Sequence, residues 1–167
     1  MQSFNDSITI AAPASRVVEL ITTETYLRLR YEEPQVQSFD LDITEDSDSA
    51  FAYQLRRNIA TGDKVPRMAR KIVGDTIKVV QTQRWDRVTP PFNAEMTVEA
   101  EGLPGAIGAR TQLIDIDGNS CRLEVTGSVT VDIPLVGGQL EKLLAGKISD
   151  SLNQSSEAIR DYVVKNV

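Results

Sequence analysis

Residues 121–133 read Cys-Arg-Leu-Glu-Val-Thr-Gly-Ser-Val-Thr-Val-Asp-Ile, and residues 134–138 continue Pro-Leu-Val-Gly-Gly. Apolar or small residues occupy the odd positions of the first run and polar residues the even ones, which is the period of a strand with one buried face. Thirteen residues are long for a strand and indicate a strongly curved sheet. The proline ends the strand, because it has no N–H for the ladder, and we expect the two glycines to form a corner.

Beyond this corner the apolar residues change from a period of two to a spacing of three to four. This pattern predicts one amphipathic helix over residues 138–165, roughly 40 Å long at about 1.5 Å per residue. The polar run Asn153-Gln154-Ser155-Ser156 weakens the pattern slightly. The apolar stripe consists of Leu140, Leu143, Leu144, Ile148, Leu152, Ile159 and Val163.

Upstream, alternating apolar and polar residues predict a series of antiparallel strands, with Asp117-Gly118 as a hairpin signal. Two short helices come before most of them, the first after Pro13 and the second capped by Thr23 or Thr25 and ended by Pro34. A loop with Thr61-Gly62-Asp63 and Pro66 joins two strands. The expected strands cover 4–11, 35–44, 51–59, 76–87, 92–101, 105–116 and 121–133, and the short helices 13–22 and up to Tyr31.

The predicted architecture is an α+β fold in one domain over residues 1–167, with a curved antiparallel sheet of six to seven strands. A sheet that is apolar on one face must cover that face, and only the last helix is long enough to do so. A single helix laid across a curved sheet fills the concave face incompletely. We therefore expect a cavity between the sheet and this helix.

The order of elements resembles the helix-grip superfamily that includes START lipid-transfer domains and polyketide cyclases. A more specific resemblance, to the bacterial domain-of-unknown-function 2505 family, rests on the strand-to-helix junction at 127–142, on Gly102-Leu-Pro-Gly105 and on Arg84-Trp85. The resemblance covers nearly the whole chain and implies the helix-grip (START-like) fold. It also implies binding of hydrophobic molecules, which is the commoner activity of the superfamily, whereas a minority of its members are enzymes.

Composition excludes several other function classes. The chain has no histidine, which removes Ser-His-Asp and Cys-His nucleophiles and the commonest ligand of zinc, copper and non-haem iron. We expect no metal and no cofactor, and we assign no catalytic residue. The net charge of −6 argues against nucleic acid as a partner.

The expected location is the cytoplasm. The chain has no apolar run near 18 residues, so we expect no transmembrane segment. Residues 1–6 show neither the basic nor the apolar region of a signal peptide. The single cysteine, Cys121, allows no internal disulfide, which fits a reducing compartment.

The candidate binding site consists of the residues that strand parity and helix spacing direct into the expected cavity. The expected ligand is a small hydrophobic or amphipathic molecule, lipid-like or polycyclic. Its apolar walls would be Phe51, Leu55, Met96, Val98, Leu144, Ile148 and Leu152, its polar anchors Tyr53, Arg57 and Gln81, and the lone tryptophan, Trp85, would be a core residue or part of the wall.

Two alternatives remain open from the sequence. The chain could be an enzyme of the cyclase or aromatase kind that uses Tyr53 or Arg57 on such a ligand. It could also be a protein-interaction module, because residues 54–87 hold nine Lys and Arg against three Asp and could attract an acidic partner.

Overall fold

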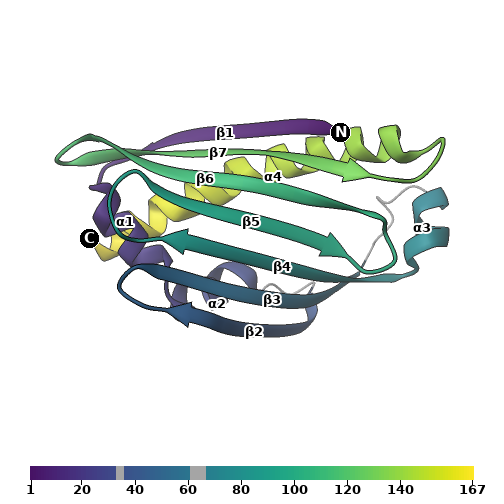
Figure 1. Cartoon of the computed structure of the whole chain (residues 1–167), viewed down its shortest axis with the longest axis horizontal. Coiled ribbons are helices and arrows are strands. Elements are labelled where there is room, and N and C mark those ends of the chain that lie inside the picture. Colours follow the sequence, from purple (N-terminus) through teal and green to yellow (C-terminus); the bar gives the residue numbers. More distant parts are fainter. Residues whose placement is uncertain (33–35, 61–66) are drawn as a thin grey trace.

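The computed structural model describes residues 1–32, 36–60 and 67–167. Seven antiparallel strands form one sheet in the order β1-β7-β6-β5-β4-β3-β2. The long C-terminal helix α4 runs obliquely behind this sheet, as Figure 1 shows. The predicted α+β architecture, a curved antiparallel sheet with two short helices near the N-terminus and one long C-terminal helix, is confirmed.

The N-terminal segment forms the edge strand β1 (Gln2–Ile10) and the helices α1 (Ala14–Ile21) and α2 (Glu24–Tyr31). Pro13 occupies the N-cap position of α1. Of the two predicted caps of α2, the structure has Thr23, whose hydroxyl accepts a hydrogen bond of 3.1 Å from the backbone N–H of Tyr26. This bond satisfies one of the N–H groups that the first turn leaves without an intrahelical acceptor. The predicted stop at Pro34 lies outside the described residues.

The remaining strands are antiparallel, and each pairs with its neighbour in sequence. The Asp117-Gly118 hairpin is confirmed, and the Asp117 carboxylate accepts from the Asn119 N–H at 2.8 Å. The strands are β2 (Val36–Asp46), β3 (Ala50–Ala60), β4 (Thr76–Asp86), β5 (Phe92–Ala100), β6 (Gly105–Asp117) and β7 (Ser120–Val131).

The corner between β7 and α4 (Gly137–Asn166) differs in detail from the sequence prediction. The residue with a left-handed backbone is Leu135, with φ 72°, and its side chain is fully exposed. Gly137 is needed for a different reason, because a Cβ there would collide with the carbonyl group of Val131. Glu141 also holds the corner, accepting a 3.0 Å hydrogen bond from the Val131 N–H.

A short helix, α3 (Arg67–Val73), lies between β3 and β4 and was not predicted. Figure 1 shows it beyond the end of the sheet, beside the connection to β4. Helices of this length are marginal on their own and depend on their surroundings, so a single sequence carries little signal for them. The predicted loop residues Thr61-Gly62-Asp63 and Pro66, and the basic residue Lys64, lie outside the described residues.

The helices cover the sheet unevenly. Helix α4 packs mainly against β1 and β7, the strands at one edge. Helices α1 and α2 contribute Val17, Ile21 and Leu27 to a core cluster with inward residues of the sheet such as Leu55 and Leu113. The helices therefore pack on different parts of the sheet, α4 along one edge and α1 and α2 over the core cluster.

Candidate functional site

A cavity of about 340 Å³ lies between the concave face of the sheet and the helices α2 and α4. Its sheet wall is formed by inward residues of β4 to β7, with Phe4 from β1 and Arg57 from β3 at the sides. The helix wall comes from α2 and from α4, which contributes Ile148, Leu152 and Ile159. The expected cavity between the sheet and α4 is thus present.

Most of the sheet wall is apolar and follows from strand parity. Met96 and Val98 of β5 lie beside Ile107 of β6, since Val98 pairs with Ile107 in the register of the two strands. Leu123 and Val125 of β7 continue this wall towards α4. The outward neighbours Thr97 and Glu99 are exposed, so the alternation read from the sequence places these side chains on the correct faces.

One end of the cavity is polar and consists of a connected set of hydrogen bonds. Gln81 donates its side-chain amide to two phenol oxygens, that of Tyr53 at 2.8 Å and that of Tyr31 at 3.0 Å. The Gln81 carbonyl accepts from the Arg57 guanidinium at 3.3 Å. Tyr53 in turn donates to the carbonyl oxygen of Gln83 at 2.9 Å. Because Gln81 and Tyr53 are almost fully buried, these bonds replace contacts with water that both side chains have lost.

Two buried tyrosines of this region, Tyr53 and Tyr26, have a raised pKa. Burial, and secondarily the neighbouring Tyr31, hold the pKa of Tyr53 well above its usual value near 10. Burial likewise raises the pKa of Tyr26. The Tyr53 hydroxyl is therefore a lasting hydrogen-bond donor, not a base, at neutral pH.

Two contacts join α2 to α4 at the cavity. The Arg30 guanidinium donates to the hydroxyl of Ser155, and the rings of Tyr26 and Tyr162 lie with centroids 5.0 Å apart. Nearby, the Ser156 hydroxyl donates to Asp6 of β1 at 2.6 Å. The polar run that weakened the helix pattern therefore includes Ser155 and Ser156, which line the cavity and tie α4 to its neighbours.

The structure brings many of the predicted site residues together around the cavity. Arg57, Gln81, Trp85, Met96, Val98, Ile148 and Leu152 line it. Phe51, Tyr53 and Leu55 do not line it; they are buried in the core cluster beneath α1 and α2, and only the Tyr53 hydroxyl reaches the polar end. Leu144 packs instead with Val129, Val131 and Leu140 near the corner. The alternation of side chains along a strand identifies its inward face. It does not indicate which part of that face a helix covers.

Residues of α2 are the main part of the site that the sequence analysis missed. Arg30 and Tyr31 line the cavity, although the sequence analysis assigned no site residue to this helix. The hydrophobic pattern of α2 is weak, because charged residues alternate with apolar ones, so it did not indicate which side of the helix faces the sheet.

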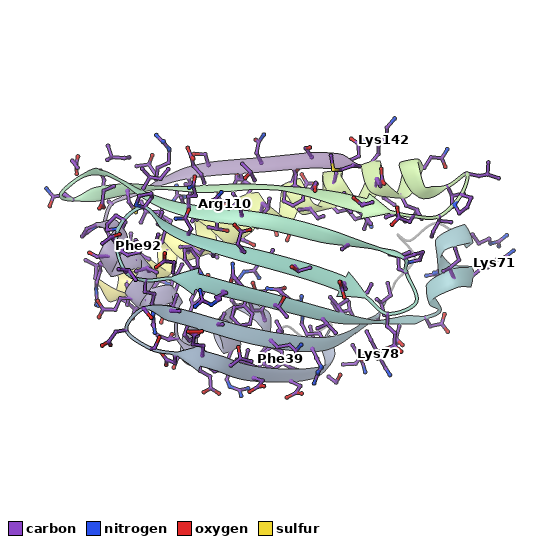
Figure 2. All side chains as sticks on the ribbon, viewed as in Figure 1. Phe39, Lys71, Lys78, Phe92, Arg110 and Lys142 are labelled. Atoms are coloured by element: carbon purple, nitrogen blue, oxygen red, sulfur yellow. The ribbon has the colours of Figure 1, made fainter. Side chains whose placement is uncertain are left out.

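The basic residues of segment 54–87 that the structure describes do not all lie on one face. Arg57 faces the cavity, whereas Arg84 pairs with Glu45 at 3.3 Å on the outer face and Arg87 pairs with Asp46 at 2.6 Å. Figure 2 shows Lys71 and Lys78 at the end of the molecule that carries α3. The basic side chains on the strands lie on different faces because neighbouring residues of a strand point to opposite faces of the sheet.

The structure bears on two further expectations. Within the ranges 1–32, 36–60 and 67–167, no cluster of side chains with metal-ligand chemistry occurs. In the same part of the chain, no helix combines the length and the apolar character that crossing a membrane requires.

Solved structures with this fold include START-type proteins and enzymes. A crystal structure of TTHA0849 from Thermus thermophilus has a TM-score of 0.66 at 15% identity, covering 99% of each chain. A START superfamily protein from Mycobacterium smegmatis has a TM-score of 0.59 at 15% identity, again covering 99% of each chain. The Zhui aromatase/cyclase from Streptomyces sp. R1128 has a TM-score of 0.55 at 16% identity, covering 99% of this chain and 92% of that one. These likenesses show a START-like fold.

No match was found among curated proteins. A family model does match, over residues 6–163, which is nearly the whole chain and includes the cavity-lining residues other than Phe4. The chain therefore belongs to the family described as protein of unknown function (DUF2505).

Proposed function

We propose that this chain binds a small hydrophobic or amphipathic molecule in the cavity between the sheet and α4. The observation that carries the proposal is the cavity itself, whose 340 Å³ falls within the range of about 300–1,000 Å³ of small-molecule sites. Its make-up is also typical of such sites, with apolar walls and a few polar groups at one end. START-like neighbours agree with this proposal at the level of the fold only.

Binding or carriage is better supported than catalysis. A cyclase or aromatase reaction needs an acid or a base at the cavity wall. Tyr53, one of the two candidates for such chemistry beside Arg57, is buried behind the wall, and its hydroxyl is engaged with Gln81 and Gln83. Its raised pKa also removes it as a base at neutral pH. The interaction-module alternative loses its main support, because the basic residues of 54–87 are distributed over several surfaces.

The lone tryptophan gives a direct assay, because Trp85 lines the cavity and is 4% exposed. A ligand that enters should change its emission in a saturable way, and no other tryptophan contributes to the signal. We expect saturable binding of Nile red, a neutral apolar dye, and a co-purified small molecule in native mass spectra of freshly prepared protein. Failure of both would refute the proposal.

A pair of variants tests whether the dye occupies the cavity. Val98→Phe places a larger side chain into it, whereas Thr97→Phe adds the same ring to the outer face of the same strand. We expect Val98→Phe to weaken dye binding by about tenfold or more, since it removes volume that the dye needs. Thr97→Phe should leave it unchanged. Equal effects of the two variants would show that the dye binds elsewhere.

A further inference from the structure

One buried polar side chain has no hydrogen-bond partner among the residues that the structure describes. Apart from the tyrosines and the tryptophan, five polar or charged residues are buried there: Thr22, Gln81, Thr111, Glu141 and Ser156. Four of the five donate or accept hydrogen bonds through their side chains. Thr111 of β6 is the exception. Because a buried hydroxyl without a partner destabilises the folded state, this exception needs an explanation.

Thr111 lies in an apolar part of the cavity wall. It is 8% exposed and lines the cavity on the concave face of the sheet. Its cross-strand partners are Ala94 of β5 and Val125 of β7, and the inward residues before and after it on β6 are Ala109 and Leu113. All four are buried and apolar. None of these side chains can form a hydrogen bond, so the threonine hydroxyl is left for an occupant of the cavity.

The fold alone does not account for a hydroxyl at this position. Valine has nearly the same shape as threonine, suits a buried strand equally well and would bring no polar group into the wall. Residues that are unfavourable where they stand are kept mainly at functional sites, where binding or activity offsets their cost in stability. A role in ligand binding therefore explains Thr111 better than a role in packing.

Resting on the proposed function, we propose that the Thr111 hydroxyl forms a hydrogen bond with an oxygen atom on the apolar body of the ligand. The ligand is then an oxygenated hydrophobic molecule that bears a hydroxyl or carbonyl group, because a threonine hydroxyl can donate to either. A plain hydrocarbon chain or ring would leave Thr111 without a partner. This assignment names the ligand class, which the volume of the cavity does not.

The position of Trp85 makes this contact measurable. Trp85 pairs with Ala94 of β5, and Ala94 pairs with Thr111, so the three residues form one row across the sheet. The row spans two strand spacings, which is about 10 Å. Trp85 and Thr111 both line the cavity. The emission of the single tryptophan therefore reports on a molecule bound beside Thr111.

Two probes with the same ring test the contact in wild-type protein and in Thr111→Val. Cyclodecanone and cyclodecane differ by one carbonyl oxygen, and each is titrated against the emission of Trp85 below its solubility limit. We expect Thr111→Val to weaken cyclodecanone binding about fivefold, which is the usual net gain from one neutral hydrogen bond. Cyclodecane binding should not weaken. Thr126→Val is the matched control, since Thr126 is exposed on the outer face of β7, and it should change neither affinity.

The stability of the ligand-free protein gives a second measurement. In urea denaturation, Thr111→Val should shift the midpoint upward, because it removes an unpaired buried hydroxyl without removing volume. Thr126→Val should shift the midpoint less. A variant that is more stable and binds cyclodecanone less tightly shows that the hydroxyl serves the ligand and not the fold. A lower midpoint for Thr111→Val would show a structural role for the hydroxyl and overturn the inference.

The outcomes separate the two proposals. Unchanged cyclodecanone binding in Thr111→Val, or equal weakening of both rings, overturns the inference and leaves the proposed function standing. Weakened cyclodecanone binding in Tyr26→Phe alone also overturns it, because Tyr26 is the buried phenol that α2 contributes to the wall. Failure of cyclodecanone to bind wild-type protein that binds Nile red has the same meaning. If neither ring nor Nile red binds and no small molecule co-purifies, the proposed function itself is overturned.

Discussion

Tyr53→Phe deletes the hydroxyl that joins Gln81 to Gln83 at the polar end of the cavity. The ring stays in place, so the variant removes hydrogen bonds and leaves no large void. Gln81 is 4% exposed and would lose an acceptor 2.8 Å away that water cannot easily replace. An unsatisfied buried donor costs about 1–3 kcal/mol. Gln83 is only half-buried and can bond to water instead, so we expect the free energy of unfolding to fall by about 1–3 kcal/mol.

The pH dependence of this loss follows from the raised pKa of Tyr53. Burial holds that pKa well above 10 in the folded protein, while in the unfolded chain it is about 10. Below pH 10 both states keep the proton, so the wild-type advantage is constant. Above pH 10 the unfolded chain loses the proton first, and the stability that the buried phenol contributes falls by about 1.4 kcal/mol per pH unit. The phenylalanine variant has no such proton to lose, so the two proteins should converge in stability between pH 10 and 12.

Urea denaturation at pH 7 and at steps from pH 9.5 to 11.5 measures both effects. Tyr162→Phe is the control, because its ring packs on Tyr26 while its hydroxyl makes no hydrogen bond within the described part of the chain. This control should change the free energy of unfolding by less than about 0.5 kcal/mol at pH 7. A Tyr53→Phe variant as stable as wild type at pH 7, or a gap that stays constant above pH 10, would refute the hydrogen-bond assignment.

Three further predictions concern single positions away from the polar end. Gly127→Ala should lower the free energy of unfolding by about 1–3 kcal/mol in urea denaturation, since the new Cβ would lie 2.5 Å from the Phe4 ring and also strike the Gly108 carbonyl; an unchanged midpoint would contradict this packing. Leu135→Gly should raise it by about 0.5–1 kcal/mol, because glycine adopts the φ of 72° without strain and the exposed leucine packs on nothing there; a lower midpoint would count against this. Burial, with Asp115 as a second cause, raises the pKa of the Cys121 thiol to about 11, so 5,5′-dithiobis(2-nitrobenzoate) at pH 8 should label it only after unfolding; fast labelling of native protein would be the opposite result.

The fold could be predicted from the sequence because its sheet has one buried and one exposed face. In such strands the period of two identifies each inward side chain, and this period alone placed Arg57, Gln81 and Val98 on the cavity side. The long C-terminal helix could also be predicted, because its apolar residues recur every three to four positions. The Asp117-Gly118 pair predicted the hairpin. In such a short connection, the turn itself fixes the register of the two strands.

Features that depend on tertiary placement could not be predicted in the same way. Nothing in the sequence indicates that α4 packs mainly against β1 and β7, so Leu144 was placed in the cavity wall instead of the corner cluster. The contribution of Arg30 and Tyr31 depends on how α2 is rotated against the sheet. Its side chains carry too weak a hydrophobic pattern to fix that rotation.

Helix α2 links the stability of this protein to the chemistry of its cavity. Tyr31 ends α2, accepts from Gln81 and supplies the ring on which Arg30 and Arg57 meet. A substitution that removes the buried hydrogen bonds of Gln81 therefore changes the stability of the fold and the shape of the site together. A loss of ligand binding in such a variant would not separate the two effects. Arg30 is different, because it is half-exposed and its bond to Ser155 lies between two helices outside the sheet. A substitution at Arg30 therefore changes a residue of the cavity wall while the Gln81 hydrogen bonds remain.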